Sequence, residues 1–459
     1  MVKVKNPLKS MNFSDLYLQI FGFLISIGTL TMVAASSYFG FRPLEMLSFR
    51  SLDEGCDQVT SGIGNHCFSD YQLPMYLIGQ SNPWINGHSY PPISMFPHYV
   101  FSSIRESFIG HEAAMYLWLL LVLISISYPI VLSLKSKKIS HPFILGASLS
   151  LFTTAGLASL DRGTSAVFAT PFLYLAAKEF LNNNPRKVLL WVTLASFVRP
   201  QFILLAFLLL ALRAYKYFIS SIGILISSIL LGFAIWPGDR KLHFQSWLSM
   251  LTSYDQYASS SANWPINISA GKSVSKIFSF FEQKFPSYEI FSSLNSWSLA
   301  NFKNIGIYLG ILVFILFLFL GNKISKSIVV IISLLSPAFI PGVSWSYYLL
   351  VLIPISALLI SANRAGEGML DLDQELNPVA KVHILITVAL VLSPFVLPYL
   401  FEPNKVSVYD SDYTALIAQF WGPILIILYT HLIGLGIWLG FNKSMNLKTI
   451  FAKNPVNPV

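Results

Sequence analysis

Charged residues are scarce in this sequence. Only 11% of its 459 residues are Asp, Glu, Lys or Arg, and 54% are hydrophobic. Soluble domains carry roughly 25% charged residues. A chain of this length would form about three such domains, and so few charges cannot cover their surfaces. The composition therefore excludes a soluble protein and indicates a protein that crosses a membrane several times.

Other absences exclude further classes. Two cysteines are too few for a disulfide scaffold, no glycine repeat suggests collagen, and 15% aromatic residues exclude a disordered chain. The net charge of +9 comes from Lys and Arg scattered between apolar runs, so we expect no nucleic-acid partner. Patterns such as CxxC, HExxH, the P-loop and the Rossmann fingerprint are absent, so no soluble nucleotide cofactor is expected.

Long apolar runs fill most of the chain. A spanning helix needs about 20 mostly apolar residues, and ten runs are candidates, several of them short. We expect them at 16–40, 113–134, 142–160, 164–181, 217–236, 305–320, 328–340, 347–359, 383–401 and 416–441. The first run has no small-residue cleavage site and is expected to be retained.

Positive charges predict the orientation of these helices. More than half of the 30 Lys and Arg residues fall in the N-terminal segment or in connections on its side of the membrane. Because cytoplasmic loops carry the excess of Lys and Arg, both termini are predicted inside. Arg199-Pro200 breaks the run 188–212, and the count holds only if this run returns to the face it entered. We therefore expect a re-entrant helical pair, which is tolerated beside a protein-lined cavity.

The predicted fold is a single all-α polytopic membrane domain over 1–459, with about ten transmembrane helices and the re-entrant pair. Two long polar segments, 41–112 and 237–304, should form loops over the extracytoplasmic face. Cys56 and Cys67 lie in the first loop, on a side that is oxidising in most cells, which favours a disulfide. Two free thiols are the alternative.

The first loop contains the most distinctive polar sequence. A short amphipathic helix is predicted to begin at Asp70, and Asn82-Pro83 and Tyr90-Pro91-Pro92 predict rigid turns after it. Asp70 could serve as a helix N-cap or as a general base at the membrane surface. The loop alone leaves both roles open.

The run Asp-x-x-x-x-x-Tyr…Asn-Pro-Trp…Tyr-Pro-Pro from Asp70 resembles the membrane glycosyltransferases of the C superfamily. It is most similar to glycosyltransferase family 87, the polyprenol-phosphate-mannose-dependent α-mannosyltransferases. Further matching pieces follow in order along most of the chain: Asp161-Arg162-Gly163, expected at the outer start of a helix, Val198-Arg199-Pro200-Gln201, Asn267-Ile268-Ser269-Ala270-Gly271 and Ser346-Tyr347-Tyr348-Leu349. The chain departs from the family at Ser344-Trp345-Ser346, where members often carry His, and this leaves the donor sugar open.

The resemblance implies a GT-C type fold and a sugar on a lipid phosphate as donor. Asp70 matches the general base, and one carboxylate without a covalent intermediate implies inversion at the anomeric carbon. Arg162 and Arg199 are the expected phosphate ligands, because guanidinium matches phosphate oxygens and is costly in apolar sequence without a partner. The alternatives are a structural ion pair for Arg199 and, for Arg162, a place at the membrane interface or a pair with Asp161, itself expected to cap a helix.

Weaker candidates complete the predicted site. For phosphate or donor binding they are His88, Tyr90, Tyr347 and Tyr348, and for a sugar contact Asn267. Turn packing, a loop position or an interfacial aromatic belt would explain these residues as well. Asp410-Ser411-Asp412 has no second ligand cluster beside it, so no metal site is expected, and His431 is expected to be a packing residue.

These observations predict a glycosyltransferase of the cell membrane with its active site outside the cytoplasm. It would move a hexose, mannose by the resemblance, from a polyprenyl phosphate to a lipid-linked or glycan acceptor. Glucose and arabinofuranose remain open as donor sugars. The alternatives are a flippase or transporter of lipid-linked saccharides, which should show paired broken helices, and a non-catalytic subunit of glycan assembly.

Overall fold

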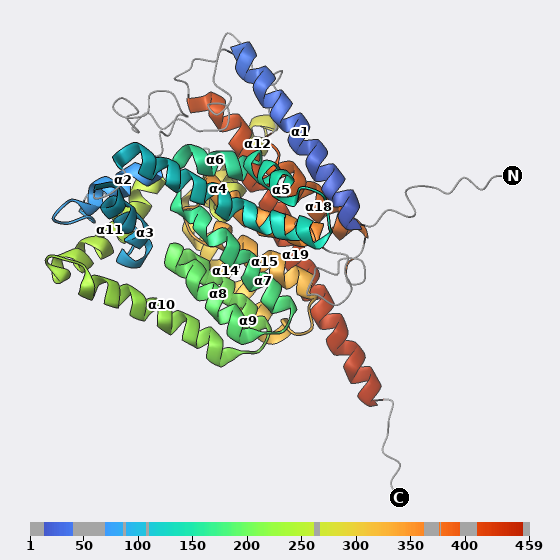
Figure 1. The fold of residues 1–459 in the computed structure, drawn as a ribbon. Helices are drawn as coiled ribbons and strands as arrows, with labels where there is room; N and C mark the ends of the chain where they lie inside the picture. The colour runs from blue at the N-terminus through green and yellow to red at the C-terminus, as the bar shows by residue number, and fades with distance from the viewer. Residues whose placement is uncertain are drawn as a thin grey trace, which may run out of the picture.

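The protein is helical throughout the part that the computed structural model describes (Figure 1). The described residues are 13–39, 69–85, 89–106, 110–260, 267–361, 376, 378–394 and 411–452. Among them the sole β pairing is an isolated bridge between Asn267 and Trp345. The predicted all-α class is therefore confirmed.

Five of the described helices are long and apolar enough to cross a membrane. They are α1 (Phe13–Phe39), α4 (Gly110–Ser136), α10 (Tyr215–Ile235), α14 (Phe302–Leu320) and α19 (Ser411–Ala452). A sixth candidate is the pair α5 (Pro142–Leu151) and α6 (Thr154–Arg162), which bends by 77°. These helices support a multi-pass membrane protein, and the ten crossings stay a prediction.

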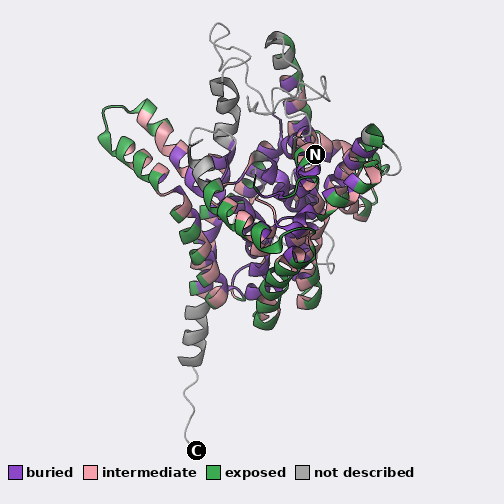
Figure 2. Cartoon of the chain, turned by 90° about the vertical axis from the view of Figure 1, so that its left-hand side faces the viewer, coloured by how far each residue is buried: buried purple, intermediate pink, exposed green. Residues whose placement is uncertain are grey.

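Several predicted spans form helices that are short for a bilayer. They are η4 (Ser165–Ala169) with α7 (Thr170–Leu181), α15 (Lys326–Phe339), η6 (Ser346–Val351) with α16 (Leu352–Ile360), and α18 (Pro378–Leu392). The 14 residues of α15 cover about 21 Å, whereas the hydrocarbon core is about 30 Å thick. Every residue of α15 after Lys326, and every residue of α16, is buried. These helices therefore form the core of the bundle, and exposed residues gather on the outer helices (Figure 2).

The segment predicted as one span at 142–160 is instead broken. α5 ends at Leu151 and α6 begins at Thr154, with the Thr153 hydroxyl accepting a hydrogen bond from the Gly156 amide at 2.9 Å. A Cβ on Gly156 would lie 2.2 Å from the Ser150 carbonyl oxygen. The side-chain cap at Thr153 and the close backbone approach at Gly156 fix the bend. Neither feature can be read from the apolar content of the sequence.

The chain also breaks at Arg199-Pro200, as the sequence predicts. α8 (Pro185–Val198) ends there, Arg199 is extended at φ −146° and ψ 121°, and η5 (Pro200–Ala206) continues into α9 (Phe207–Ala211). Proline lacks an N–H and disfavours a helical conformation for the residue before it. α8 packs against η5 and α9, so the chain folds back on itself at the break. Entry and return on one membrane face stay a prediction.

The described parts of the two long loops are helical. The first contains α2 (Ser69–Ile78), which is the helix predicted from Asp70, and α3 (Pro92–Ile104). The second contains α11 (Arg240–Ser260), α12 (Ala270–Lys284) and α13 (Glu289–Ala300). Figure 1 shows α2, α3 and α11 gathered at one side of the molecule, away from the start of α1 and the end of α19.

Candidate active site

The predicted base and one predicted phosphate ligand contact each other. Arg162 Nε donates a hydrogen bond to Asp70 Oδ1 at 3.2 Å, and the two side chains are only 15% and 14% exposed. Asp70 lies in the first turn of α2, yet its carboxylate pairs with this guanidinium. The other oxygen, Oδ2, is buried and has no hydrogen-bond partner among the described residues. Arg162 thus orients one oxygen of the carboxylate, and the other oxygen can accept a hydrogen bond from a ligand.

Arg162 reaches Asp70 because of how α6 ends. Gly163 adopts the left-handed conformation at φ 62°, and its amide donates to the Leu160 carbonyl. Glycine is favoured at such a helix end because it lacks a Cβ. The predicted helix start at Asp161-Arg162-Gly163 is therefore wrong, because these residues form the end of α6 and the next element is capped by Thr164.

Trp118 of α4 supports both sides of the ion pair. Its indole Nε1 donates to the Gly163 carbonyl at 2.8 Å. Its ring lies 5.1 Å from the ring of Tyr71 and 4.7 Å from that of His98. His98 Nε2 in turn lies 3.1 Å from the backbone oxygen of Asp70. The start of α2 and the end of α6 are consequently fixed against one buried residue.

The second predicted phosphate ligand lies in the same site. Arg199 is 1% exposed, and its guanidinium carbon lies 3.5 Å from the centre of the Tyr90 ring. Its Nη2 donates to the Thr164 hydroxyl at 3.5 Å, while Nε and Nη1 are buried without a hydrogen-bond partner in the described part of the chain. Asp70 is among the groups whose charge acts on Arg199. The two arginines and the acid thus share one electrostatic environment.

Tyr347 and Tyr348 complete the wall of the site. The guanidinium carbon of Arg162 lies 5.6 Å from the centre of the Tyr347 ring, and the two tyrosine rings are 4.8 Å apart. Both side chains are buried, at 2% and 3% exposure. An interfacial belt would leave them at the lipid boundary, so their burial favours a place in the site.

The loop that carries Tyr90 is held by two tryptophans. Trp84 Nε1 donates to the Tyr90 carbonyl at 2.8 Å, and Trp247 Nε1 of α11 donates to the Ser89 carbonyl at 3.0 Å. The Trp84 ring packs 4.9 Å from Phe233 of α10. The sequence indicates Trp84 only through the Asn-Pro-Trp motif. It does not indicate Trp247, because nothing in the sequence links α11 to this turn.

Asn267 has a structural set of contacts. Its Oδ1 accepts hydrogen bonds from the amides of Ser269 at 3.0 Å and Ser344 at 3.1 Å, and its backbone pairs with Trp345. Asn267 therefore joins the start of α12 to the segment before Tyr347. Three predicted residues, His88, Cys56 and Cys67, lie outside the described residues.

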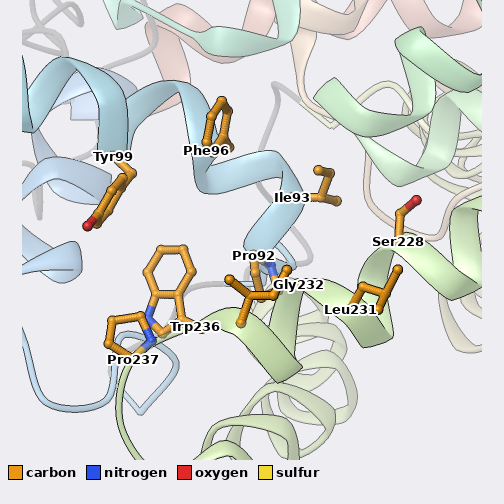
Figure 3. Close-up of a pocket in the computed structure, with 10 residues that line it drawn as sticks. Pro92, Ile93, Phe96, Tyr99, Ser228, Leu231, Gly232, Trp236 and Pro237 are labelled. Atoms are coloured by element: carbon orange, nitrogen blue, oxygen red, sulfur yellow. The ribbon is translucent and has the colours of Figure 1, made fainter.

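An apolar groove of about 460 Å³ runs beside this site, between α3 and α10 (Figure 3). Its walls include Pro92 and Phe96 of α3, Ser228 and Leu231 of α10, and Trp236. Pro92 follows Tyr90 by two residues, so the groove begins next to the ring that covers Arg199. The Ser94 hydroxyl donates to the Phe197 carbonyl at 2.9 Å, which ties α3 to the end of α8.

The arrangement combines three chemical capacities. Arg162 and Arg199 supply two guanidinium groups beside the carboxylate of Asp70, and guanidinium groups suit an anionic ligand. Asp70 Oδ2 can accept a proton, and the groove can hold an apolar chain.

No family model matches this chain, and no curated protein or solved structure matches it.

Proposed function

We propose that this protein is a membrane glycosyltransferase that moves a hexose from a polyprenyl phosphate to a hydroxyl group of a glycan or glycolipid acceptor. One observation carries the proposal: Oδ2 of Asp70 and Nε and Nη1 of Arg199 are buried in one site, and none of them has a hydrogen-bond partner among the residues that the structure describes. Buried polar groups are costly without partners. A ligand with both a hydroxyl and an anionic group would satisfy both sets.

Asp70 acts as the general base in this reaction. The acceptor oxygen attacks the anomeric carbon, its proton passes to Asp70 Oδ2, and the bond from the anomeric carbon to the phosphate oxygen breaks. Polyprenyl phosphate leaves with the bonding electron pair. Arg162 Nε donates to Oδ1 at 3.2 Å, so the carboxylate is oriented before the acceptor arrives. With no covalent intermediate, the anomeric centre inverts.

Arg199 stabilises the departing phosphate. Its Nε and Nη1 groups can donate to two phosphate oxygens, while the Tyr90 ring at 3.5 Å holds the guanidinium plane. Donors that are already oriented toward developing charge lower the barrier without reorganisation. A phosphate monoester is a weak base, so a general acid is not required.

The groove between α3 and α10 holds the prenyl tail. Its lining is largely aliphatic and aromatic, and it starts beside the Arg199 site. A donor embedded in the bilayer would thus present its head group to the arginines from the side of the groove. Mannose is the donor sugar that the sequence resemblance implies, and the described contacts do not select among hexoses.

Transfer by the purified protein in liposomes tests this function. Radiolabelled mannose on polyprenyl phosphate should appear in a new glycosidic bond when a glycolipid acceptor is present, with glucose and arabinofuranose donors run in parallel. Movement of the intact lipid-linked sugar between leaflets without a new bond would instead identify a transporter and overturn the proposal.

A further inference from the structure

A second cavity, of about 420 Å³, lies between α2 and α3, and Tyr99 lines both this cavity and the groove. It is lined by the second half of α2 with the turn that follows, and by the end of α3 with the two residues after it. The polar side chains in this lining include Gln80, Ser102, Ser103, Arg105 and Glu106. None of the residues proposed to act in sugar transfer lines this cavity.

The lining has the chemistry of a saccharide site. Gln80, Arg105, Glu106 and two serines offer donors and acceptors for hydroxyl groups, and the rings of Tyr76 and Tyr99 offer flat apolar faces. Sugars present the same combination of hydroxyl groups and an apolar C–H face.

Three of the polar groups contact one another before any ligand binds. Glu106 Oε1 accepts hydrogen bonds from Ser102 Oγ at 3.4 Å and from Arg105 Nη2 at 3.3 Å. The Tyr99 ring is fixed by the edge of Trp236 at 5.9 Å. A ligand would therefore meet a partly ordered surface, which reduces the entropy lost on binding.

The cavity lies along the same helix as the proposed base. Asp70 is in the first turn of α2, and the lining begins at Met75 and ends at Gln80. At about 1.5 Å per residue, the part of the lining on α2, from Met75 to Ile78, lies roughly 8–12 Å from Asp70 along the helix axis. This is more than one sugar unit and within the reach of a short oligosaccharide whose terminal hydroxyl is at Asp70.

We propose that the cavity between α2 and α3 binds the acceptor saccharide one or two units away from the hydroxyl that receives the hexose. The proposal rests on the proposed function for the identity of the acceptor. It makes the acceptor an oligosaccharide rather than a single sugar, because only a longer chain fills the cavity and reaches Asp70 together.

Binding measured without donor tests the subsite separately from transfer. The probes are methyl glycosides with one, two and three units of mannose, glucose or galactose, observed by saturation-transfer NMR with the protein in nanodiscs. The variants are Tyr76→Ala and Gln80→Ala, whose side chains are exposed and can be replaced without opening the core. Tyr116→Ala is the matched control, since Tyr116 is 60% exposed, close to the 66% of Tyr76, and lies outside the cavity.

We expect the affinity of the unmodified protein for the glycosides to rise with the number of sugar units. In Tyr76→Ala the affinity for the trisaccharide should fall about tenfold. In Tyr116→Ala it should not change. Length-dependent binding that the cavity variants weaken supports the subsite even if the protein transfers no sugar. Equal binding of all three lengths, or binding that neither variant alters, overturns the subsite even if transfer is observed.

Discussion

The guanidinium of Arg199 lies 3.5 Å from the centre of the Tyr90 ring. The two residues are 109 positions apart and come from a helix break and a loop, two places where the backbone is irregular. Their contact joins the turn before α3 to the end of α8 and puts a buried cation where the apolar groove begins.

Asp70→Asn should abolish sugar transfer. The amide keeps the size of the side chain but cannot take the proton of the acceptor, and general base catalysis contributes about 10²–10⁴-fold. Initial rates with labelled donor measure the effect. Asp239→Asn is the control, because Asp239 is an exposed carboxylate that caps the start of α11. Full turnover in Asp70→Asn would remove Asp70 from the mechanism.

Arg199→Met should weaken donor binding without lowering stability. Nε and Nη1 of Arg199 have no described partners, so replacing a buried, poorly bonded cation with an apolar side chain is neutral or stabilising. Titration with a short-chain prenyl phosphate should show a loss of about tenfold or more in affinity. The control Arg240→Met, at an exposed position at the start of α11, should leave the affinity unchanged. A large drop in the unfolding temperature with unaltered affinity would show that Arg199 is structural.

Ser228→Trp should block the groove. Ser228 lines it, whereas the neighbouring Ser227 is exposed and does not. The bulky ring should raise KM for a long-chain prenyl donor about tenfold and leave a donor with one isoprene unit unaffected. Ser227→Trp is the matched control. If both variants impair both donors equally, the groove does not hold the tail.

Trp84→Phe should act on the site through Tyr90. The variant removes the indole donor at 2.8 Å from the Tyr90 carbonyl, and loss of such a hydrogen bond costs about 0.5–1.5 kcal/mol. We expect a lower free energy of unfolding together with a higher KM for the donor, because the ring over Arg199 is no longer fixed. Trp297→Phe, at an exposed position on α13, should change neither quantity. A loss of stability with an unchanged KM for the donor would show that the turn before α3 does not affect donor binding.

Lys276 should make stability depend on pH. Burial, reinforced by the neighbouring charge of Lys272, lowers the pKa of Lys276 to about 7 from its usual 10.5. Between these two values the unfolded chain binds more protons than the folded one, so stability should rise as pH increases from about 7 to about 10.5. Lys276→Met should flatten this part of the profile of unfolding temperature against pH. A profile identical to that of the wild type would contradict the lowered pKa.

Much of the fold followed from composition and local pattern. Low charge and long apolar runs predicted a helical membrane protein, Arg199-Pro200 predicted the break after α8, and the polar run from Asp70 predicted α2. The bend between α5 and α6 was not predicted, because it depends on the contact of Gly156 with the backbone of Ser150 rather than on apolar content.

The candidate site was only partly predictable. The sequence singled out Asp70, Arg162, Arg199, Tyr90, Tyr347 and Tyr348 through motifs that each carry little information. For Arg162 it left open a role in phosphate binding, a place at the membrane interface or a pair with Asp161, and the structure shows a contact with Asp70 at 3.2 Å. It also missed Trp118 and Trp247, whose indoles hold the end of α6 and the Tyr90 turn from distant helices.

By itself the sequence determined what the chain could not be and which residues were costly to bury. Scarce charge requires a lipid environment, and arginine in apolar sequence requires a partner. Only the tertiary structure decided which partners those are. Contacts between α2, α6 and the break after α8 span large separations in the chain, and they depend on how the helices pack rather than on any local pattern.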